Sequence, residues 1–343
     1  MSLKQTCDFL LAGGVAGLLA ACTNPAAAPP AAPGPALRVW PPPPAVARVL
    51  LEGSFATPAD LGMQPTWTDR VVNLLTGGNR GREKLVKPFG VAVDEAGNLC
   101  LTDTGANVVW FFDRVRGRYA RWEQIGKVAF VLPVAVAKAG GIIYVADAGL
   151  GQVVAFDEAG RSRFRIAAPF IRPAGLALSG EKLYVADAGA HCVLIFDLAG
   201  RPLGRFGARG VAPGEFNFPT HVTADAQGRI YVTDAMNSRV QVFDAAGRFL
   251  SEVGSIGDGS GHFSRPKGVA VDSSGHVYVA DALFDNIQVF DPAGNFLLDL
   301  GTTGSGPGEF WMPAGIAIGR DNRIYVADAY NGRVQLLRYV GPP

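Results

Sequence analysis

One phrase recurs six times along the chain, and its spacing restricts the fold more than any other feature. Its clearest copy, residues 265–291, reads RPKGVAVDSSGHVYVADALFDNIQVFD: three β-branched or aromatic runs separated by polar, glycine-containing breaks. Such runs predict three consecutive β-strands joined by turns. An aspartate ends the second run of each copy, at Asp103, Asp147, Asp187, Asp234, Asp281 and Asp328. Successive copies are therefore 40 to 47 residues apart.

Two further positions keep the same register. A proline stands 14 or 15 residues before each aspartate, at Pro88, Pro133, Pro173, Pro219, Pro266 and Pro313. An apolar residue stands nine residues after it, and in five copies a turn such as residues 244–247 (DAAG) then leads into a fourth run. Four strands repeated at this period are typical of a propeller blade, whose faces are buried only when blades pack in a ring. We therefore predict an all-β, six-bladed β-propeller.

The sixth copy lacks a fourth run, because only six residues follow Leu337. A three-stranded blade would leave an open sheet edge. Residues 47–55 (ARVLLEGSF) precede the repeats and alternate partly, so we predict that they pair with the strand around residues 333–337 and close the ring. Trp67, Val71, Leu74 and Leu75 have helical spacing and are followed by glycine, which predicts one short helix before the first blade.

The first 44 residues have a different composition. Residues 1–21 resemble a bacterial lipoprotein signal peptide, because Lys4 precedes an apolar run too short to span a bilayer and the run ends LAAC. The resemblance implies lipidation of Cys22, with a palmitate-type anchor, and sorting to the outer membrane. Residues 22–44 are rich in alanine and proline and predict an extended tether. We expect a protein of the cell envelope, lipid-anchored and facing the periplasm or the surface.

The domain boundaries follow. Residues 45–343 should form the propeller, with the closing strand and helix in residues 45–86 and the repeats in residues 87–343. The pattern P-x-G-V-A-V-D-x-x-G-x-Y-V-A-D-A-x-N-x-R-V-Q-V-F-D resembles the NHL repeat over about residues 85–340. The resemblance implies the propeller fold. It leaves the activity open, because NHL propellers include RNA binders, protein binders and a few lyases.

Charge and cysteines exclude some classes of function. The 31 basic and 30 acidic residues give a net charge of +1, which argues against non-specific nucleic-acid binding. Cys100 takes the place that tyrosine holds in the other five blades, so we expect it in the core. Cys192 lies two blades away, and we expect no disulfide between them. No C-x-x-C motif is present to attach haem, and we expect no cofactor.

The strand order predicts two unlike faces. Short, similar D-x-x-G turns should lie on one face, and the other should carry the loops after the aspartates and the long connections 207–216, 254–263 and 301–310. Variable loops on a rigid scaffold are where specificity usually resides, so we expect the site on this second face, around the mouth of the channel. We expect the six aspartates to be structural, because an aspartate at a strand end can accept hydrogen bonds from turn amides.

Basic and apolar residues in these loops are the candidate contacts. Lys87, Arg172 and Arg265 precede blade-opening prolines and Lys267 follows one. With His221 they predict a positive potential suited to an anionic ligand, the alternative being solvated charges paired with nearby acids. Phe284 and Tyr330, with Leu150 and Trp311, could add an apolar contact patch on the same face.

Histidines raise the question of a metal. His191, His221 and His262 could lie on this face in neighbouring blades, and three histidines can bind zinc. We expect only His221 to look into the channel; its equivalents are glycine or alanine. The amidating lyases among NHL proteins carry several inward histidines, and this chain departs from that pattern. We therefore assign no metal ligand and keep His191 and His221 as candidate contacts.

Three functions remain open. The leading hypothesis is a monomeric protein-binding scaffold, whose partner is another envelope protein within a multi-protein complex. The alternatives are a metal-dependent propeller enzyme of the lyase or lactonase type, and a binder of a small anionic ligand or glycan. No phosphate-binding loop, dinucleotide fingerprint or nucleophile elbow is found in the sequence.

Overall fold

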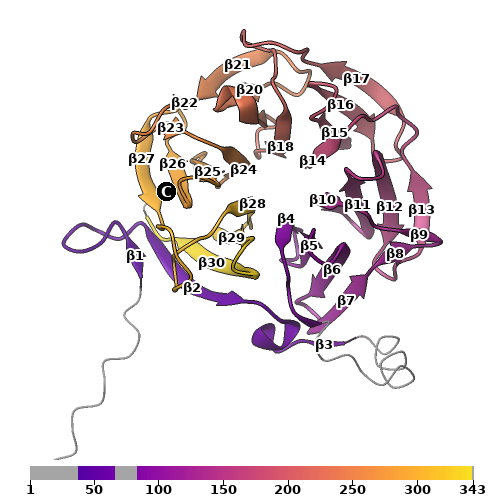
Figure 1. Ribbon diagram of the computed structural model, residues 1–343, viewed down its shortest axis with the longest axis horizontal. Helices are drawn as coiled ribbons and strands as arrows, with labels where there is room; N and C mark the ends of the chain where they lie inside the picture. The colour runs from indigo at the N-terminus through magenta and orange to yellow at the C-terminus, as the bar shows by residue number, and fades with distance from the viewer. Residues whose placement is uncertain (1–37, 66–82, 342–343) are drawn as a thin grey trace, which may run out of the picture. The chain divides into compact units, whose positions relative to one another are not determined.

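The computed structural model describes residues 38–65 and 83–341, which form a ring of six mainly antiparallel β-sheets (Figure 1). Each blade begins with its innermost strand. The strands are β4 (Pro88–Val93), β5 (Leu99–Asp103), β6 (Val108–Asp113) and β7 (Arg118–Trp122) in blade 1; β10 (Pro133–Ala139), β11 (Ile142–Asp147), β12 (Gln152–Asp157) and β13 (Ser162–Arg165) in blade 2; and β14 (Pro173–Ser179), β15 (Lys182–Asp187), β16 (Cys192–Asp197) and β17 (Pro202–Phe206) in blade 3.

The second half of the ring repeats this order. Its strands are β18 (Pro219–Ala224), β19 (Ile230–Asp234), β20 (Arg239–Phe243) and β21 (Phe249–Val253) in blade 4; β24 (Pro266–Val271), β25 (Val277–Asp281), β26 (Asn286–Phe290) and β27 (Phe296–Leu300) in blade 5; and β28 (Pro313–Ile318), β29 (Arg323–Asp328) and β30 (Arg333–Tyr339) in blade 6. Every innermost strand begins at the repeated proline, and every second strand ends at the repeated aspartate, as the spacing predicted.

A segment from before the repeats closes the ring, which confirms the prediction. Strand β2 (Val49–Phe55) pairs antiparallel with β30, with Val49 opposite Tyr339 and Phe55 opposite Val334. Figure 1 shows this indigo strand beside the yellow end of the chain. The outer edge of the sixth sheet is therefore covered by residues that stand 279 to 290 positions earlier in the sequence, since 334 − 55 is 279 and 339 − 49 is 290.

The predicted boundary between the tether and the propeller, after residue 44, lies too late in the sequence. Strand β1 (Val39–Trp40) pairs with β2, and the Trp40 side chain is buried in the core. Arg38 Nη1 also donates a hydrogen bond of 2.9 Å to the Pro307 carbonyl oxygen. The folded part therefore includes Arg38 to Trp40, which alternation alone did not reveal because a two-residue strand is too short to carry a pattern.

Several predictions fall on residues outside those that the structure describes. The signal peptide, Cys22 and most of the tether lie within residues 1–37, and the helix around residues 67–75 lies within residues 66–82. The described residues before blade 1 form the 3-10 turn η1 (Pro58–Leu61) and β3 (Gln64–Pro65), which pairs in parallel with β7. Across residues 38–65 and 83–341, no helix has the length and apolar character needed to span a membrane.

Short elements complete the described connections. They are the hairpin β8 (Gln124–Ile125) with β9 (Val128–Ala129), the parallel pair β22 (Ser255–Ile256) with β23 (His262–Phe263), and the 3-10 turn η3 (Ala235–Asn237). The long connections of blades 4 to 6 are held by a glutamine in each third strand. In blade 4, for example, Gln241 accepts a hydrogen bond from the Gly214 amide and donates one to the Glu215 carbonyl oxygen.

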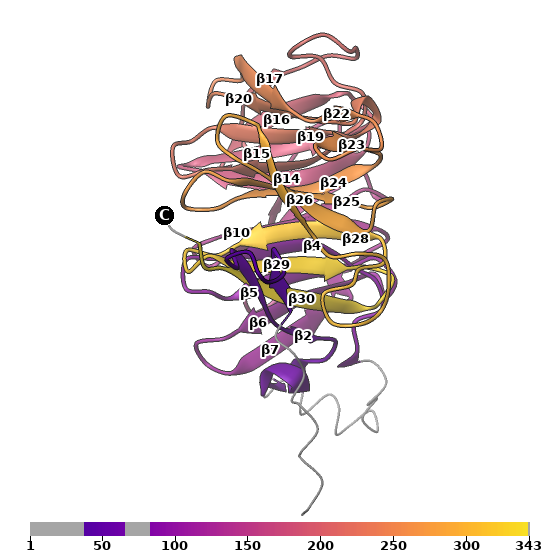
Figure 2. The ribbon, with the colours of Figure 1, turned by 90° about the vertical axis from the view of Figure 1, so that its left-hand side faces the viewer.

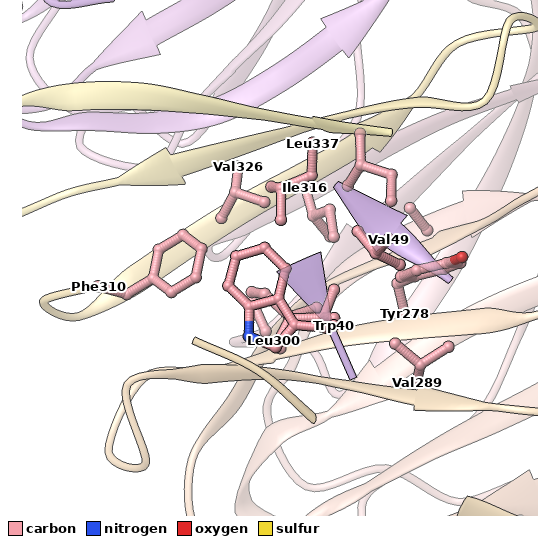
Figure 3. Packing of buried hydrophobic residues seen from close by; sticks show 13 residues of the cluster. Trp40, Val49, Tyr278, Val289, Leu300, Phe310, Ile316, Val326 and Leu337 are labelled. Atoms are coloured by element: carbon pink, nitrogen blue, oxygen red, sulfur yellow. The ribbon is translucent and has the colours of Figure 1, made fainter. Parts of the chain in front are cut away.

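The core lies between neighbouring sheets rather than in one central mass. Figure 3 shows one such layer, in which Trp40 and Val49 from the closing segment pack with Tyr278, Phe310 and Leu337. Burying apolar side chains of this size stabilises each by about 1.5–3 kcal/mol, so the layer ties the closing segment to blades 5 and 6. Cys100 and Cys192 are both buried and free, as expected, and burial raises the pKa of the Cys100 thiol.

The repeated aspartates are structural, as predicted. Asp281 accepts hydrogen bonds from the amides of Leu283 and Phe284 in the following loop, and from those of Ser264 and Arg265 before the inner strand. Asp103, Asp147 and Asp187 each make the same four contacts in their blades. The carboxylate therefore fixes the residues before each blade-opening proline beside the loop after the second strand.

The ring has two faces, which Figure 2 shows from the side, with the strands running across the thickness of the ring. Residues next to the blade-opening prolines and the loops after the repeated aspartates lie together on one face, because the hydrogen bonds of those aspartates join them. The D-x-x-G turns lie at the other ends of the strands. We call the first the loop face and the second the turn face.

Candidate binding site

A bulge follows the blade-opening proline of each inner strand on the loop face, and five of the six residues directly after these prolines line the mouth of the channel. The proline of the inner strand pairs with the repeated aspartate, and the register shifts immediately afterwards, as between Pro219 and His221. A β-bulge bends the strand and redirects the extra residue. The residues that follow the six prolines are Phe89, Val134, Ala174, Thr220, Lys267 and Ala314.

A cavity of about 280 Å³ lies at this mouth, and we call it the mouth cavity. Blade 4 contributes Phe218, Thr220, His221 and Met236. The facing lining residues come from blades 1, 2, 3 and 5 and are Phe89, Val134, Ala148, Arg172, Ala174, Ala188, Arg265, Pro266 and Lys267. Four of the sequence-predicted residues, Arg172, His221, Arg265 and Lys267, are thus brought together. Apart from Thr220, the rest of the lining is apolar, and the lining contains no aspartate or glutamate.

The cations of the mouth cavity have no acidic partner. In the described part of the chain, the side chains of Arg172, Arg265 and Lys267 form no ion pair. Elsewhere such pairs are common, as between Arg239 and Asp234 at 3.0 Å. The alternative of charges paired with nearby acids is therefore not found for these three residues in the described chain, and the structure favours a positive potential at the mouth.

Lys267 is the most buried of these cations. Its Nζ atom, from blade 5, lies 4.9 Å from the centre of the Phe89 ring of blade 1. Burial, with further contributions from the charges of Arg265 and Lys87, lowers the pKa of Lys267 from 10.5 to about 8. The ammonium is therefore still charged at neutral pH, but it is poorly solvated and lies among like charges.

His221 is neutral and has no hydrogen-bond partner. Burial, followed by the charge of Lys267, lowers its pKa to about 3. Its ring stacks on Phe89 with a centroid distance of 5.9 Å. Among the described residues, neither ring nitrogen finds a partner, and the buried hydroxyls of Thr220 and Thr233 likewise have none. Buried polar groups in proteins are nearly always hydrogen-bonded, so this cluster on blade 4 needs a partner from outside the described chain.

The close approach of the inner strands explains why four of the other blades carry glycine at the position of His221. A Cβ on Gly175 would lie 2.9 Å from the His221 Cα, and one on Gly315 would lie 2.3 Å from the Phe89 carbonyl oxygen. The inner strands thus approach too closely for most side chains at this level. Blade 4 carries the one large side chain at this position.

The remaining predicted contacts lie outside the mouth cavity. Lys87 reaches the Tyr330 ring, with Nζ 4.3 Å from the ring centre, and donates a hydrogen bond of 3.3 Å to its hydroxyl. His191 Nδ1 accepts a hydrogen bond of 3.3 Å from the Phe218 amide and therefore links blades 3 and 4. Phe284 is half-buried, and its amide donates to Asp281.

The turn face carries the opposite arrangement. A cavity of about 690 Å³ opens among its turns and includes the acidic residues Asp94, Glu95, Asp225 and Asp272. These acids have partners: Lys138 lies 2.7 Å from Asp94, Arg229 lies 2.6 Å from Asp225, and Arg320 lies 2.5 Å from Glu95. His276 Nδ1 lies 2.9 Å from Asp272. Asp94, Asp225 and Glu95 at this end of the channel are therefore paired with cations, whereas the cations of the mouth cavity have no acidic partner in the described chain.

The described residues also bear on the metal-enzyme alternative. Residues 38–65 and 83–341 contain no group of three or more histidine, cysteine or carboxylate side chains positioned to hold a metal ion. His262 lies in β23 outside the mouth cavity, and its carbonyl oxygen accepts a hydrogen bond from Gln288. The three histidines considered from the sequence are thus not assembled into one site.

The mouth-cavity residues that sequence reasoning missed include Phe89, Phe218, Thr220 and Met236. A usable pattern existed for two of them, because Phe89 and Thr220 directly follow a blade-opening proline, as Lys267 does. Comparing that position across all six blades would have selected them. Phe218 stands directly before Pro219, the position that selected Arg172 and Arg265, and Met236 lies in the loop after Asp234, so a comparison of these positions would have selected both as well.

Comparisons with known proteins agree with the fold. The family described as a 6-bladed beta-propeller matches residues 224–281 and 273–339, and the NHL repeat matches residues 170–196. No curated protein matches the sequence significantly.

Among solved structures, the chain is similar to a streptogramin B lyase, with a TM-score of 0.55 at 14% identity over 75% of this chain and 94% of that chain. It is similar to an auxiliary nutrient binding protein from Bacteroides thetaiotaomicron, with a TM-score of 0.59 at 13% identity over 74% and 69%. It is also similar to Kuenenia stuttgartiensis hydrazine synthase, with a TM-score of 0.54 at 14% identity over 75% and 96%. Identities this low establish a shared fold and nothing more. The chain is a six-bladed β-propeller with NHL-type repeats.

Proposed function

We propose that this propeller is an exported, lipid-anchored binding module whose loop face docks a protein partner of the cell envelope. The observation that carries the proposal is a set of exposed apolar side chains around the mouth, which we call the apolar rim. Its members are Val86, Val131, Ile171, Phe218, Met236, Leu283, Trp311 and Tyr330.

The members of the apolar rim stand at repeated positions in the blades. Every blade contributes at least one member, and all members occupy either the two residues before a blade-opening proline or the loop after a repeated aspartate. On the turn face, the short turns between the strands expose one large apolar side chain among the described residues, that of Val115. Scattered apolar residues need no explanation, but a continuous set around a concave mouth marks an interaction surface.

The chemistry of the apolar rim favours a protein as the partner. The Trp311 and Tyr330 rings pack against each other at a tilt of 38° with a centroid distance of 5.6 Å, and each is about half exposed. Large aromatic side chains with a polar atom are enriched at protein interfaces, where they contribute much of the binding energy. The repeated aspartates hold the backbone of these loops in place, so docking orders little of the chain and loses little entropy.

Export and anchoring rest on the sequence of residues 1–44. The apolar run that ends at Cys22 supports a lipid anchor, and the alanine- and proline-rich segment that follows supports a spacer. Replacing Cys22 with serine should move the protein from the membrane fraction to the soluble fraction of cells. Retention in the membrane fraction, resistant to salt, would contradict the anchor.

The docking proposal is tested by placing a photo-reactive phenylalanine analogue at Leu283 on the apolar rim and, separately, at Leu203 on an outer strand. Both side chains are 55% exposed, so the two positions are matched for access. Irradiation of cells should yield one discrete adduct from position 283, and adding Met236→Asp should remove it. Equal adducts from both positions, or an adduct unaffected by Met236→Asp, would count against the proposal.

A further inference from the structure

The mouth cavity combines positive charge with a mostly apolar lining. Its cations are uncompensated, because Arg172, Arg265 and Lys267 face an enclosure that includes no carboxylate. Lys87, on the neighbouring rim, adds to the same potential and contacts Tyr330 instead of an acid. Positive charge gathered in a concave, low-dielectric site attracts an anion and strengthens its binding.

Two adjacent polar side chains of blade 4 that line the cavity have no hydrogen-bond partner in the described chain. Thr220 and His221 are adjacent in β18, and the Thr220 hydroxyl and both His221 ring nitrogens are buried without a partner in the described chain. Lys267 has a cation–π contact with Phe89 but no hydrogen bond to any described residue. Leaving such groups unsatisfied is costly, and the acceptor oxygens of a ligand bound in the cavity would give these donors partners.

The rest of the lining sets the kind of anion. Phe89, Phe218, Met236 and Val134 surround the polar set with apolar surface. Arg172 and Arg265 are exposed at the edge, so Lys267 is the single cation in the interior. A single buried cation compensates a monoanion, whereas a dianion would lose more hydration than it regains. The volume of about 280 Å³ is near the lower end for small-molecule pockets, which leaves room for one compact ligand.

We propose that the mouth cavity binds the carboxylate of a small organic acid with an apolar or aromatic body. The carboxylate accepts hydrogen bonds from Lys267, Thr220 and His221, and the body packs between Phe89, Phe218 and Met236. This goes beyond the docking of a protein on the apolar rim, because the cavity can be filled whether or not a partner covers the rim. The same chemistry has two sources: a free organic acid, and the carboxyl terminus of a peptide that ends in an aromatic residue.

Titration calorimetry on the purified protein at pH 7 separates these cases. The probes are 3-phenylpropionate, its neutral amide, inorganic phosphate, and acetyl-Gly-Gly-Phe with a free carboxyl terminus. The expected result is one site per chain for 3-phenylpropionate or for the peptide, with the amide and phosphate about tenfold weaker or more, as the loss of a charged hydrogen bond implies. Binding by the peptide alone identifies a chain terminus as the source. Binding by 3-phenylpropionate identifies a free acid.

Substitutions locate the site. Lys267→Met and Thr220→Val should each weaken the bound probe about tenfold or more, and Arg172→Gln, at an exposed position, should weaken it less. Lys127→Met is the matched control, because Lys127 is exposed outside the mouth cavity and loses the same charge. Circular dichroism checks that each variant is folded. The proposal is overturned if no probe binds at millimolar concentration, if the amide or phosphate binds as tightly as the acid, or if Lys127→Met has the effect of Lys267→Met. A negative result here leaves the cross-linking experiment on the apolar rim unaffected.

Discussion

Replacing Lys267 with methionine should make the protein more stable at neutral pH, although it removes a residue of the proposed site. The folded protein lowers the pKa of Lys267 from 10.5 to about 8, because the ammonium is buried near Arg265 and Lys87. A difference of about 2.5 in pKa corresponds to about 3 kcal/mol of unfolding free energy at a pH where both states are protonated. Methionine has a similar shape and carries no charge that must be desolvated.

The gain is smaller than this figure, because the variant also loses the contact between Nζ and the Phe89 ring at 4.9 Å. A cation–π contact of this kind stabilises by about 1 kcal/mol. The expected stabilisation is therefore about 2 kcal/mol at pH 7. A residue that costs stability and is nevertheless present fits a functional role, since activity and stability commonly trade off in this way.

The pH dependence has a definite sign. Below pH 8, Lys267 is charged in both the folded and the unfolded protein, and its burial lowers stability by the full amount. Between about pH 8 and 10.5 the folded protein releases the proton first, so the wild-type protein becomes more stable relative to the variant. The advantage of Lys267→Met should therefore shrink across this range.

Urea unfolding of wild type and Lys267→Met at pH 7, 8.5 and 10 measures the effect, and Lys127→Met serves as the control with an expected change below about 0.5 kcal/mol at each pH. A variant less stable than wild type at pH 7 would refute the reasoning. So would a gain that stays constant up to pH 10, because burial of the charge could not then be its cause.

Four further predictions follow from the same structure. Phe55→Ala should lower the unfolding free energy by about 3–5 kcal/mol in urea titrations, because Phe55 is buried in the closing strand and its ring centre lies 5.5 Å from that of Phe112. The control is Leu297→Ala, at a half-exposed position on an outer strand. Equal effects of the two substitutions would contradict ring closure by β2. Asp281→Ala should lower the unfolding free energy by about 3–5 kcal/mol in thermal or urea unfolding, because four backbone amides lose their acceptor. Asp281→Asn should lower it less. A change below about 1 kcal/mol for Asp281→Ala would exclude the structural role. Affinity for 3-phenylpropionate should stay constant from pH 6 to 7, where the probe is ionised and His221, with a pKa of about 3, remains neutral, and should fall above pH 8 as Lys267 loses its proton; a change between pH 6 and 7 would point to another group. Cys100 and Cys192 should react with a thiol reagent only after unfolding, because both are buried and burial raises the pKa of both; rapid labelling of the folded protein would show that the blades open.

Much of the fold could be predicted from the sequence because each blade repeats one local pattern. Alternating apolar runs define strands, and the fixed distances from Pro266 to Asp281 and onward to Phe290 define where they begin and end. The sixth repeat has too few residues after Leu337 for a fourth strand, and residues 47–55 were the remaining segment with strand character. The closing strand could therefore be predicted. β1 escaped prediction because two residues next to a run of prolines carry no periodicity.

The candidate site could be predicted only in part. Pattern comparison selected the right face and the four residues Arg172, His221, Arg265 and Lys267, since each stands next to a repeated landmark. It could not decide whether their charges are paired, because ion pairing depends on distances between side chains in different blades. For the same reason His191 was kept as a contact, although it joins blade 3 to the Phe218 amide.

The sequence by itself determined the number of blades, their strand limits, the closing segment and the structural task of the aspartates, because these depend on local periodicity and on the need to cover a sheet edge. Only the tertiary structure decided that Phe89 of blade 1 meets His221 of blade 4 and Lys267 of blade 5 across the channel. These residues are up to 178 positions apart, 267 − 89 being 178. Closing the ring brings them together in an apolar cavity with no acid, and that enclosure is what makes their charge and their free hydrogen-bonding atoms available to a ligand.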